Sequence, residues 1–340
     1  MVSSWKNISI KKIARESGFG TATVDRVLNN RNGVSEKSKK AVQLTLEKLL
    51  NNPKTKQVKN ILICCESGPS YNKTLQNVIY KKNIELNLGF ICTSHFVAAK
   101  DFKKSIFSKL ILENYKSYDA LIIVAQEDTI INQAVEKFAF QNKPVITLTT
   151  DLPNSNRTAY VGSDQSNAGS TAAYLIGSSV KKQKGSVLMV MSMPYRCQQE
   201  RELGFRKVLR SEFPNINIKE SVYTLDTSEE SYKNVKKYIK DNGAPLAIYN
   251  ISGGNLGIAE AIKENNCQDQ VIFVGHELNK NSKNLLESNL MHYVIGHDVS
   301  YEVEQSFNII NNFYNNQYIN NVITDVKIYT KYNCLNKTLY

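Results

Sequence analysis

The stretch Ile8–Ser35, ISIKKIARESGFGTATVDRVLNNRNGVS, predicts two short helices joined by a tight turn. Ser9 is placed to accept a backbone N–H at the start of the first helix. Apolar residues recur on one face of this helix: Ile10, Ile13 and Ala14. Gly18 is placed to end it in a left-handed conformation, which glycine adopts without a steric penalty from a Cβ atom.

The second helix of this stretch has two contrasting faces. Val24, Val27 and Leu28 recur at spacings of three and four and are expected to point inward. The other face is small, polar and basic: Thr21, Ala22, Asp25, Arg26 and Asn29. A short helix of this kind fits the major groove of DNA, so the stretch predicts a helix-turn-helix. A small helical bundle that packs on another protein is the alternative.

This part of the sequence closely resembles the lactose-repressor (LacI/GalR) family of bacterial transcription regulators. The matching residues stand at unbroken spacing: Ile13-Ala14, Gly18, Thr23-Val24, Arg26-Val27, Asn29 and Val34-Ser35. The resemblance implies that Thr21, Ala22 and Arg26 read bases, whereas Thr23 and Asn29 hold phosphates and the helix end. The full set of expected DNA-binding residues is Ser9, Lys11, Thr21, Ala22, Thr23, Arg26, Asn29 and Ser35.

Two residues depart from the family pattern. Gly20 replaces the usual serine that caps the second helix, which makes a weaker cap. Asp25 replaces the usual serine beside Arg26, and it places an anion toward DNA unless a neighbouring cation pairs with it.

The positive charge of the chain is concentrated at its beginning. The 340 residues carry a net charge of +12. The segment 1–60 holds thirteen Lys and Arg against four Asp and Glu, a net charge of +9. A merely solvated basic face is the alternative, but the charge coincides with the helix-turn-helix. This distribution indicates binding to phosphates, with an affinity that falls steeply as salt rises.

The cysteines and the apolar runs bear on the location of the protein. Six cysteines show no C-x-x-C spacing and no pairing rhythm, which indicates a reducing compartment. No apolar run approaches the length of about 18 residues that a membrane-spanning helix needs. The first residues, MVSSWKNISIKK, lack the apolar core of a signal peptide. We therefore expect a cytoplasmic protein.

The sequence predicts a boundary after a third helix, which runs from Glu36 to about Leu50 and is stopped by Pro53. Residues 1–53 then form the helix-turn-helix domain, and 54–60, KTKQVKN, form a linker. Members of the resembled family usually carry a longer link with a hinge helix that inserts a leucine into the minor groove. A seven-residue polar linker is too short for that wedge, so we do not expect a hinge helix here.

From residue 61 to 340, apolar strand-like runs alternate with amphipathic helices, which predicts parallel sheets covered on both faces. A strand near Val322–Tyr329 closes the set. The region resembles the periplasmic-binding-protein-like sensor of the same family, with two lobes around a ligand cleft. The resemblance places lobe one at about 61–162 and 296–322, and lobe two at about 163–293 and 325–340. The predicted fold is therefore multidomain: an all-α DNA-binding domain, then a two-lobed α/β domain.

Candidate effector-binding residues follow the predicted strands, since ligands gather at the carboxyl ends of strands in such sheets. They are Tyr71, Asp164, Arg201, Asn250, Asn255, Glu277 and His297. Arg201 stands in R-E-L-G-F, which resembles the family's R-x-x-G-aromatic motif, whose arginine grips ligand oxygens; Arg196 is its rival. Glu277 and His297 replace residues that the family uses on the ligand.

Several of these residues have an equally good structural interpretation. Tyr71 could stack on a sugar or pack on its helix, and Asp164 could bind ligand or cap a helix. Asn250 and Asn255 flank Gly253-Gly254, which any tight turn could use. His297 could contact the ligand or the lobe crossing, and His276 is more often a packing residue.

The sequence holds none of the common hydrolase, metalloprotease or phosphate-loop motifs, so we expect no enzyme activity, no cofactor and no metal. We expect a homodimeric regulator, and specifically a repressor of carbohydrate-utilisation genes, that binds a palindromic operator and a sugar or polyol effector. Two alternatives are a DNA-binding regulator with a degenerate sensor or a protein partner, and a solute-binding protein.

Overall fold

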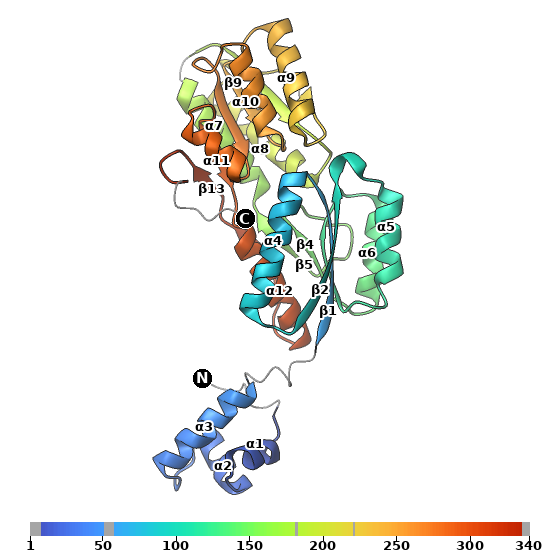
Figure 1. Cartoon of the computed structure of the whole chain (residues 1–340), viewed down its shortest axis with the longest axis vertical. Coiled ribbons are helices and arrows are strands. Elements are labelled where there is room, and N and C mark those ends of the chain that lie inside the picture. The colour runs from blue at the N-terminus through green and yellow to red at the C-terminus, as the bar shows by residue number, and fades with distance from the viewer. Residues whose placement is uncertain (1–7, 51–57, 181–182, 220–221, 335–340) are drawn as a thin grey trace. The chain divides into compact units, whose positions relative to one another are not determined.

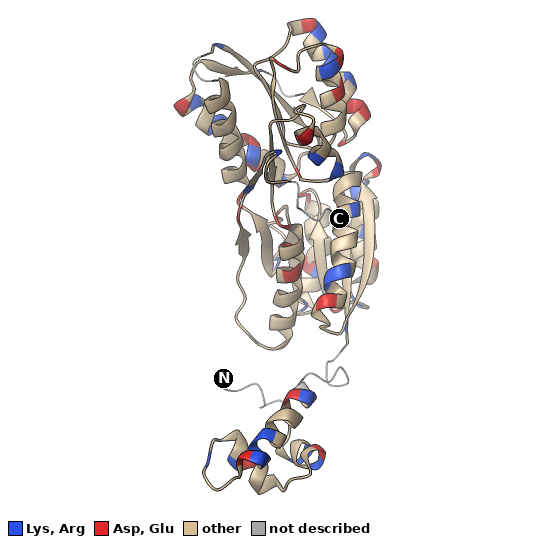
Figure 2. Ribbon diagram, turned by 60° about the vertical axis from the view of Figure 1, so that its left-hand side comes forward, with Lys and Arg blue, Asp and Glu red and all other residues tan. Residues whose placement is uncertain are grey.

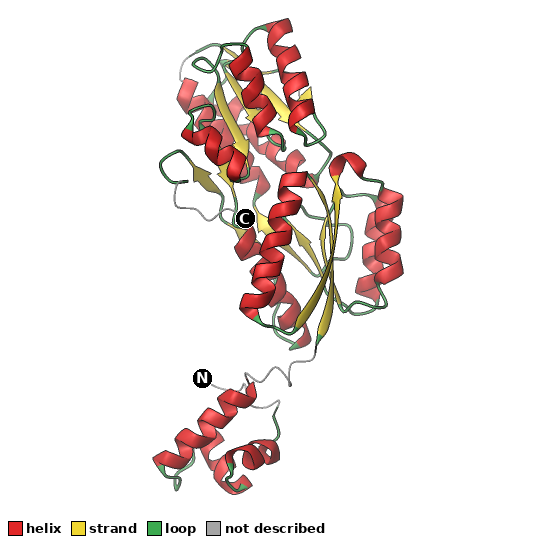
Figure 3. Cartoon of the chain, in the orientation of Figure 1, coloured by secondary structure: helices red, strands yellow, loops and turns green. Residues whose placement is uncertain are grey.

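The computed structural model describes residues 8–50, 58–180, 183–219 and 222–334 (Figure 1). The chain divides into two compact units, Met1–Val58 and Lys59–Tyr340. The first unit is built from helices, and the second alternates strands with helices (Figure 3). Among the helices described, none is long and apolar enough to cross a membrane.

The N-terminal unit contains α1 (Ile10–Ser17), α2 (Thr21–Leu28) and α3 (Glu36–Leu50), as predicted. The hydroxyl of Ser9 accepts the N–H of Lys12 at the start of α1, and Gly18 ends the helix with φ +72°. Gly20 caps α2 without a side-chain hydrogen bond, as expected for a weak cap. The three helices bury a small apolar core formed by Ile13, Ala14, Val24, Val27, Val42 and Leu49.

The second unit contains two sheets. The first sheet has the strand order β12-β5-β4-β3-β1-β2, and all its pairings are parallel. Its strands are β1 (Lys59–Ser67), β2 (Phe90–Ala98), β3 (Ala120–Val124), β4 (Val145–Leu148), β5 (Ala159–Ser163) and β12 (Val322–Thr324). Its helices are α4 (Pro69–Leu86), η3 (Ala99–Asp101), α5 (Lys104–Asn114), α6 (Thr129–Phe140) and α12 (Val299–Tyr314). We call this part lobe A (59–163 and 299–324).

Helices cover both faces of the lobe A sheet. Along β1, Ile61, Ile63 and Cys65 pack with α4 and α12, whereas Leu62 and Cys64 pack with α5 and α6. This alternation explains why the strand reads as a continuous apolar run, since both of its faces are buried.

The second sheet has the order β13-β11-β10-β9-β6-β7, with β8 paired to β6. Its strands are β6 (Gly185–Met191), β7 (Ile216–Ile218), β8 (Val222–Tyr223), β9 (Ala247–Asn250), β10 (Ile272–His276), β11 (Tyr293–Gly296) and β13 (Lys327–Tyr329). Its helices are α7 (Gln165–Val180), α8 (Arg196–Glu212), α9 (Ser228–Asn242), α10 (Asn255–Glu264) and α11 (Lys280–Glu287). Helices α7 and α8 cover one face, and α9, α10 and α11 cover the other. We call this part lobe B (165–296 and 327–334).

The expectation of parallel sheets is confirmed, with two corrections. The single strand predicted near Val322–Tyr329 is two strands: β12 belongs to the lobe A sheet, and β13 pairs antiparallel with β11 in lobe B. The two residues between them carry the chain from one sheet to the other. Strand β1 starts at Lys59, so the last two residues of the predicted linker belong to it. Residues 54–57 of that linker lie outside the described residues.

The chain passes between the two lobes three times. The passages lie between β5 and α7, between β11 and α12, and between β12 and β13. Each consists of one or two residues, so the two sheets end close to the same three short connections.

Candidate functional sites

Helix α2 presents the face that the sequence predicted for DNA. Thr21, Ala22, Arg26 and Asn29 are exposed and Thr23 is half-buried, whereas Val24 and Val27 are buried in the core. Lys11 on α1 is also exposed. Figure 2 shows Lys and Arg on all three helices of this unit. The unit therefore offers a short polar helix within a basic surface.

Three of the predicted DNA-binding residues use their side chains within the protein. The hydroxyl of Ser9 caps α1, and the hydroxyl of Ser35 accepts the N–H of Ser38 at 3.2 Å. The amide of Asn29 donates to the carboxylate of Asp25 at 2.8 Å. The structure thus gives these three residues a local structural role, and leaves Lys11, Thr21 and Arg26 without such a side-chain partner among the residues that it describes.

The charge of Asp25 is balanced locally. Arg31 Nη1 lies 3.0 Å from Asp25 Oδ2, and Asn29 donates to the other carboxylate oxygen. Arg31 is therefore the neighbouring cation that the sequence analysis required as a partner for Asp25. Three of the four anions in this part of the chain have such a partner, because Glu16 pairs with Arg15 and Glu36 pairs with Lys39.

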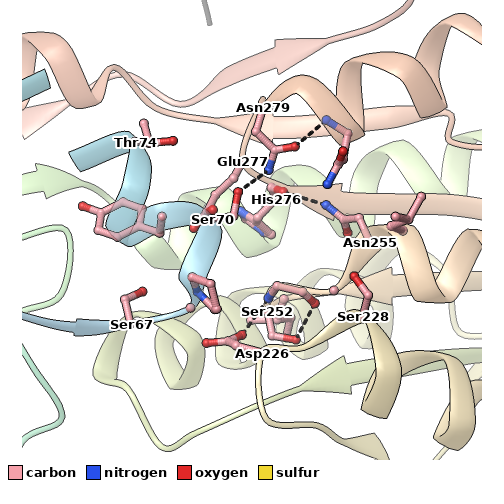
Figure 4. Close-up of a pocket in the computed structure, with 18 of the residues that line it drawn as sticks. Ser67, Ser70, Thr74, Asp226, Ser228, Ser252, Asn255, His276, Glu277 and Asn279 are labelled. Carbon is pink, nitrogen blue, oxygen red and sulfur yellow. Dashed lines mark hydrogen bonds between the residues drawn. The ribbon is translucent and has the colours of Figure 1, made fainter. Parts of the chain in front are cut away.

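In the second unit, a cavity of about 1060 Å³ lies between the two lobes. Lobe A contributes the start of α4 and the loop after β4, and lobe B contributes most of the polar groups. The lining residues include Ser67–Tyr71, Thr149, Thr150, Tyr195, Cys197, Gln198, Arg201, Asp226, Ile251–Asn255, His276, Glu277 and Asn279. In Figure 4, Asp226 and Ser252 lie on one side of the cavity, and His276, Glu277 and Asn279 lie on the other.

Hydrogen bonds join the lobes around this cavity. Four pairs span them: Glu66 with Tyr195, Ser70 with Asn279, Thr150 with Cys197, and Thr149 with Gln165. The hydroxyl of Tyr195 donates to Glu66, and the amide of Asn279 donates to Ser70 Oγ at 3.1 Å. The lobes are therefore in contact with each other around the cavity, and three of these four pairs are buried.

Arg201 is buried in α8 with its guanidinium held in place. Its Nε donates to Gln165 Oε1 at 2.7 Å, and its Nη1 donates to the carbonyl of Ile251 at 3.2 Å. A Cβ on Gly169 of α7 would lie 1.9 Å from the Arg201 carbonyl oxygen. This glycine therefore lets α7 and α8 touch backbone to backbone, which brings Gln165 to Arg201.

Two carboxylates line the same cavity. Asp226 is buried, and its Oδ1 accepts the N–H of Gly253 at 2.7 Å. Glu277 is half-buried. Burial raises the pKa of both carboxyl groups. Neighbouring His276 stays neutral, because burial lowers its pKa well below the ordinary value, and its Nε2 shares a hydrogen bond of 2.8 Å with the hydroxyl of Tyr249.

A second buried network lies at the lobe crossings. His297 Nδ1 is 2.8 Å from Glu302 Oε1, which also accepts the hydroxyl of Thr324 at 2.8 Å. Burial lowers the pKa of His297, but pairing with Glu302 outweighs it and the net shift is upward. The Nε2 atom of this histidine is buried and has no hydrogen-bond partner among the described residues.

The structure separates the predicted effector residues into two groups. Tyr71, Arg201, Asn255 and Glu277 line the cavity. Asn250 lies behind it and donates to Asn255 Oδ1 at 2.7 Å, so it orients Asn255 instead. These placements bring together side chains from α4, α8, α10 and the loop after β10.

Two of the expectations need correction, because Asp164 and His297 do not line the cavity. Asp164 is exposed and caps α7 by accepting the N–H of Asn167 at 2.9 Å. His297 lies at the β11–α12 passage, where Glu302 holds it. For both residues the structural interpretation describes the contacts better than ligand binding does.

Sequence reasoning missed Asp226, Thr149 and Gln198, which line the cavity. Asp226 follows β8, a strand of only two residues. The rule that sites follow strand ends would have found it if the run from Ile216 to Leu225 had been divided into two strands.

Two family models match the chain. "Bacterial regulatory proteins, lacI family" matches residues 9–53, and "Periplasmic binding protein domain" matches residues 103–317. No curated protein matches the sequence significantly.

Solved structures with a similar fold include sugar-binding proteins. A glucose-galactose binding protein, GanP from Geobacillus stearothermophilus, has 17% identity and a TM-score of 0.73, over 82% of this chain and 99% of that chain. A solute-binding protein of Burkholderia graminis C4D1M, in complex with D-arabinose, has 15% identity and a TM-score of 0.76, over 83% and 99%. At these identities the likeness establishes the fold. The chain belongs to the periplasmic binding protein domain family and carries at its N-terminus the helix-turn-helix of lacI-family bacterial regulatory proteins.

Proposed function

We propose that this protein is a ligand-responsive, DNA-binding transcription regulator, and that it represses carbohydrate-utilisation genes in the cytoplasm. Two copies bind a palindromic operator, and a sugar-like effector in the cavity of each copy changes the affinity for DNA. One observation carries the proposal: a single chain joins a helix-turn-helix with an exposed polar face to a two-lobed domain with a polar cavity.

The DNA-reading part of this proposal rests on the contrast between Arg26 and Lys11. Arg26 lies on the exposed face of α2, where a guanidinium can bind a guanine edge with two hydrogen bonds. Lys11 lies on α1, outside the helix that we assign to base reading, and we expect its ammonium group to contact phosphate. We expect Arg26→Ala to weaken operator binding by about 1–3 kcal/mol and to relax base preference at one position.

The measurement is selection from random duplexes, followed by fluorescence anisotropy on the selected site. Lys11→Ala is the control variant, and it should weaken binding to all duplexes by a similar factor. An Arg26→Ala protein with unchanged base preference would remove α2 from its assigned role. Wild-type protein that prefers no duplex over random competitor would refute the regulator itself and leave a solute-binding protein as the better interpretation.

The sensing part rests on Arg201, a buried cation at the wall of the cavity. We expect one or more sugars or polyols to raise the thermal stability of the protein, because a ligand that binds only the folded state stabilises it. Arg201→Ala should abolish that response and leave DNA binding without ligand unchanged. Arg206→Ala is the matched control, because Arg206 lies on the same helix, pairs with Glu202 and does not line the cavity.

One observation favours the alternative with a degenerate sensor. The contacts between Tyr195 and Glu66 and between Asn279 and Ser70 join the lobes through the protein's own side chains. A sensor held closed in this way needs no effector, and its DNA binding would be controlled by a protein partner. Sequence-specific DNA binding, without stabilisation by any member of a broad sugar and polyol panel, would favour this alternative.

A further inference from the structure

Thr149 lines the cavity with an unusual backbone conformation. It follows β4 and adopts φ +63°, in the left-handed region that residues branched at Cβ avoid. Its N–H is used by the sheet, since it donates to the carbonyl of Val161 at 2.9 Å. Strain of this kind persists where the surrounding contacts fix it. The two oxygen atoms of Thr149, which is buried, make those contacts.

The carbonyl group of Thr149 is bound at the first passage between the lobes. Gln165, the first residue of α7, donates its amide N–H to this carbonyl at 3.0 Å and accepts Arg201 Nε at 2.7 Å. The hydroxyl of Tyr160 lies 3.2 Å from the same carbonyl and 3.0 Å from the carbonyl of Ser163, the last residue of β5. Residues on both sides of the first passage are therefore connected to one carbonyl group.

The hydroxyl group of Thr149 is connected to the other two passages through Glu302. It donates to Glu302 Oε2 at 3.4 Å. Glu302 is fully buried in the first turn of α12, and its Oε1 accepts from His297 Nδ1 and from the Thr324 hydroxyl, each at 2.8 Å. His297 lies in the β11–α12 passage, and Thr324 ends β12 just before the last passage. Thr149 is thus within two hydrogen bonds of all three passages.

The same network reaches the cavity. Tyr71 and Thr149 both line it, and their hydroxyl oxygens lie 2.5 Å apart. Because Thr149 gives its single hydroxyl proton to Glu302, Tyr71 is the donor in this pair. The donors therefore follow one another from Tyr71 through Thr149 to the carboxylate of Glu302. A ligand hydroxyl that binds either cavity residue changes this series at its start.

The bond between Thr149 and Glu302 is the longest in this network. Its length of 3.4 Å exceeds the ~2.7–2.8 Å that is common for O–H···O bonds, whereas Glu302 binds Thr324 at an ordinary 2.8 Å. A bond of this length can shorten when a ligand positions Thr149, and it is lost when a ligand takes the hydroxyl proton. Either change alters the contacts of the carboxylate that holds the second and third passages.

We propose, on the basis of the function proposed above, that Thr149 is the positioning residue that couples the cavity to all three passages between the lobes. Its hydroxyl carries the effect of a bound ligand to the second and third passages, and its carbonyl carries the effect to the first. A hinge of three connections turns only when all three change together, and Thr149 is bound to each of them. The response of DNA binding to the ligand then depends on this residue.

The first test follows the passages without ligand or DNA, by hydrogen exchange of the full-length protein and mass spectrometry. Thr149→Val keeps the branched shape and loses the hydroxyl, whereas Thr149→Ser keeps the hydroxyl. We expect about threefold or more faster exchange in Thr149→Val around residues 161–168, 295–302 and 322–328, and near wild-type exchange in Thr149→Ser. Strand β3 should be unchanged in both variants, which distinguishes release of the passages from a general loss of stability.

Thr147→Val is the matched control. Thr147 is also buried, on β4, and its hydroxyl donates to Asp151 at 2.8 Å, outside the network that contains Thr149. The passages of this variant should exchange as in the wild-type protein.

The second test measures the coupling itself. Affinity for a selected operator is measured without sugar and with a saturating sugar, namely whichever of D-glucose, D-galactose, D-arabinose and their polyols changes the wild-type affinity most. We expect Thr149→Val to reduce the ratio of the two affinities about threefold or more, and Thr149→Ser to retain it. Thr324→Val should also reduce the ratio, although Thr324 does not line the cavity.

The outcomes separate this inference from the proposed function. Unchanged exchange at the passages, or a full sugar response, in Thr149→Val overturns the inference and leaves the regulator intact. Faster exchange that extends equally to β3 also overturns it, because Thr149 then serves overall stability alone. Wild-type protein that selects a duplex and responds to no member of the panel overturns the sensing half of the proposed function, and the inference falls with it.

Discussion

Three residues of the cavity, Thr149, Asp226 and Glu277, adopt a left-handed backbone that costs each of them of order 1 kcal/mol or more. Glycine adopts this conformation most easily because it has no Cβ atom, yet none of the three residues is glycine. At Glu277 the strain is combined with a carboxylate that has no donor among the described residues. The residue therefore lowers the stability of the folded protein, and its side chain is retained for another reason.

We predict that Glu277→Gly raises the free energy of unfolding of the sensor by about 1 kcal/mol, because it removes both the strain and the unpaired carboxylate. The same change should abolish the response to effector. Chemical denaturation and thermal shift with ligand measure the two effects. Asn142→Gly is the control: Asn142 is exposed at φ +52°, and its replacement should change stability little. A destabilised Glu277→Gly protein would contradict this account of the residue.

The protonation of His297 makes the stability of the folded protein fall as the pH rises. Its pKa in the folded protein is raised above the ordinary value of 6.5, since pairing with Glu302 outweighs burial. Its stabilising contribution is therefore complete below pH 6.5 and is lost as the pH rises through the folded pKa. Glu277 and Arg201 also act on this histidine. We expect the melting temperature of the ligand-free sensor to fall as pH increases from 6.5.

The variant His297→Gln should flatten this dependence, measured by thermal unfolding across the same pH range. His292→Gln is the matched control. Burial lowers the pKa of His292, so its contribution to stability rises as the pH passes upward through 6.5, opposite in sign to that of His297. An unchanged slope in His297→Gln would mean that another group titrates.

At the scale of elements, the contact between α7 and α8 decides where Arg201 lies. A Cβ on Gly204 would lie 2.0 Å from the carbonyl oxygen of Ser166, so this contact also depends on glycine. The glycine of the R-x-x-G motif thus lets its helix approach the helix that carries Gln165. The glycine of the motif and the close packing of α7 against α8 are therefore the same structural feature.

We expect Gly204→Ala to push the helices apart and to cost about 1–3 kcal/mol of stability or more. The affinity for effector should also fall, by more than the loss of stability explains, because Arg201 loses the partner that orients it. Denaturation and calorimetry measure the two losses. Gly20→Ala is the control for a Cβ that meets nothing within 4 Å, and it should cost only the difference between glycine and alanine as the cap of α2. Gly204→Ala with wild-type stability would show that the helices can move apart freely.

The order of helices and strands could be predicted from the sequence. A strand that is buried on both faces reads as a continuous apolar run, whereas a helix that is buried on one face shows apolar residues at the helical period. The sheet to which each strand belongs was harder to predict from the sequence. Residues near 322–329 read as one strand, but the link at 325–326 sends its two halves to different lobes. Periodicity shows that a strand is buried, and does not show against which sheet.

The same limit applies to the cavity. Arg201 and Glu277 were predicted from positions after strands and from motifs, and both line it. Asp226 was missed, since the run from Ile216 to Leu225 reads as one strand and the two-residue strand β8 that precedes Asp226 cannot be separated from it by periodicity. Asp164 was ambiguous for a related reason: a carboxylate at a helix start reads alike whether it caps the helix or binds a ligand.

At the scale of the whole molecule, the proposed operator binding needs two copies, and lobe A exposes an apolar surface that could join them. Tyr80 and Ile84 are one helical turn apart on α4 and are 73% and 62% exposed. Helix α4 packs beside β2, the edge strand of its sheet, where Ile91 is also exposed. Isolated exposed apolar residues are common, but a pair on one helix face beside a free edge indicates an interface.

We predict that Tyr80→Glu combined with Ile84→Glu converts the proposed dimer to a monomer in analytical ultracentrifugation. Operator affinity should fall about tenfold or more, or ~1.4 kcal/mol, although α2 is untouched. Phe140→Glu is the control, because Phe140 is 75% exposed on α6, on the opposite side of the sheet. A double variant that remains dimeric would place the interface elsewhere.

The position of α12 in the chain affects the order in which the protein can be completed during translation. Val303, Phe307 and Ile310 of this helix pack against β1 and α4, which leave the ribosome long before it does. All the parallel strands of lobe B are synthesised in between. A premature stop codon after β11 would therefore spare the three N-terminal helices and leave lobe A without one wall of its core. Late nonsense mutations should produce a protein that keeps its DNA-contacting helices but cannot sense.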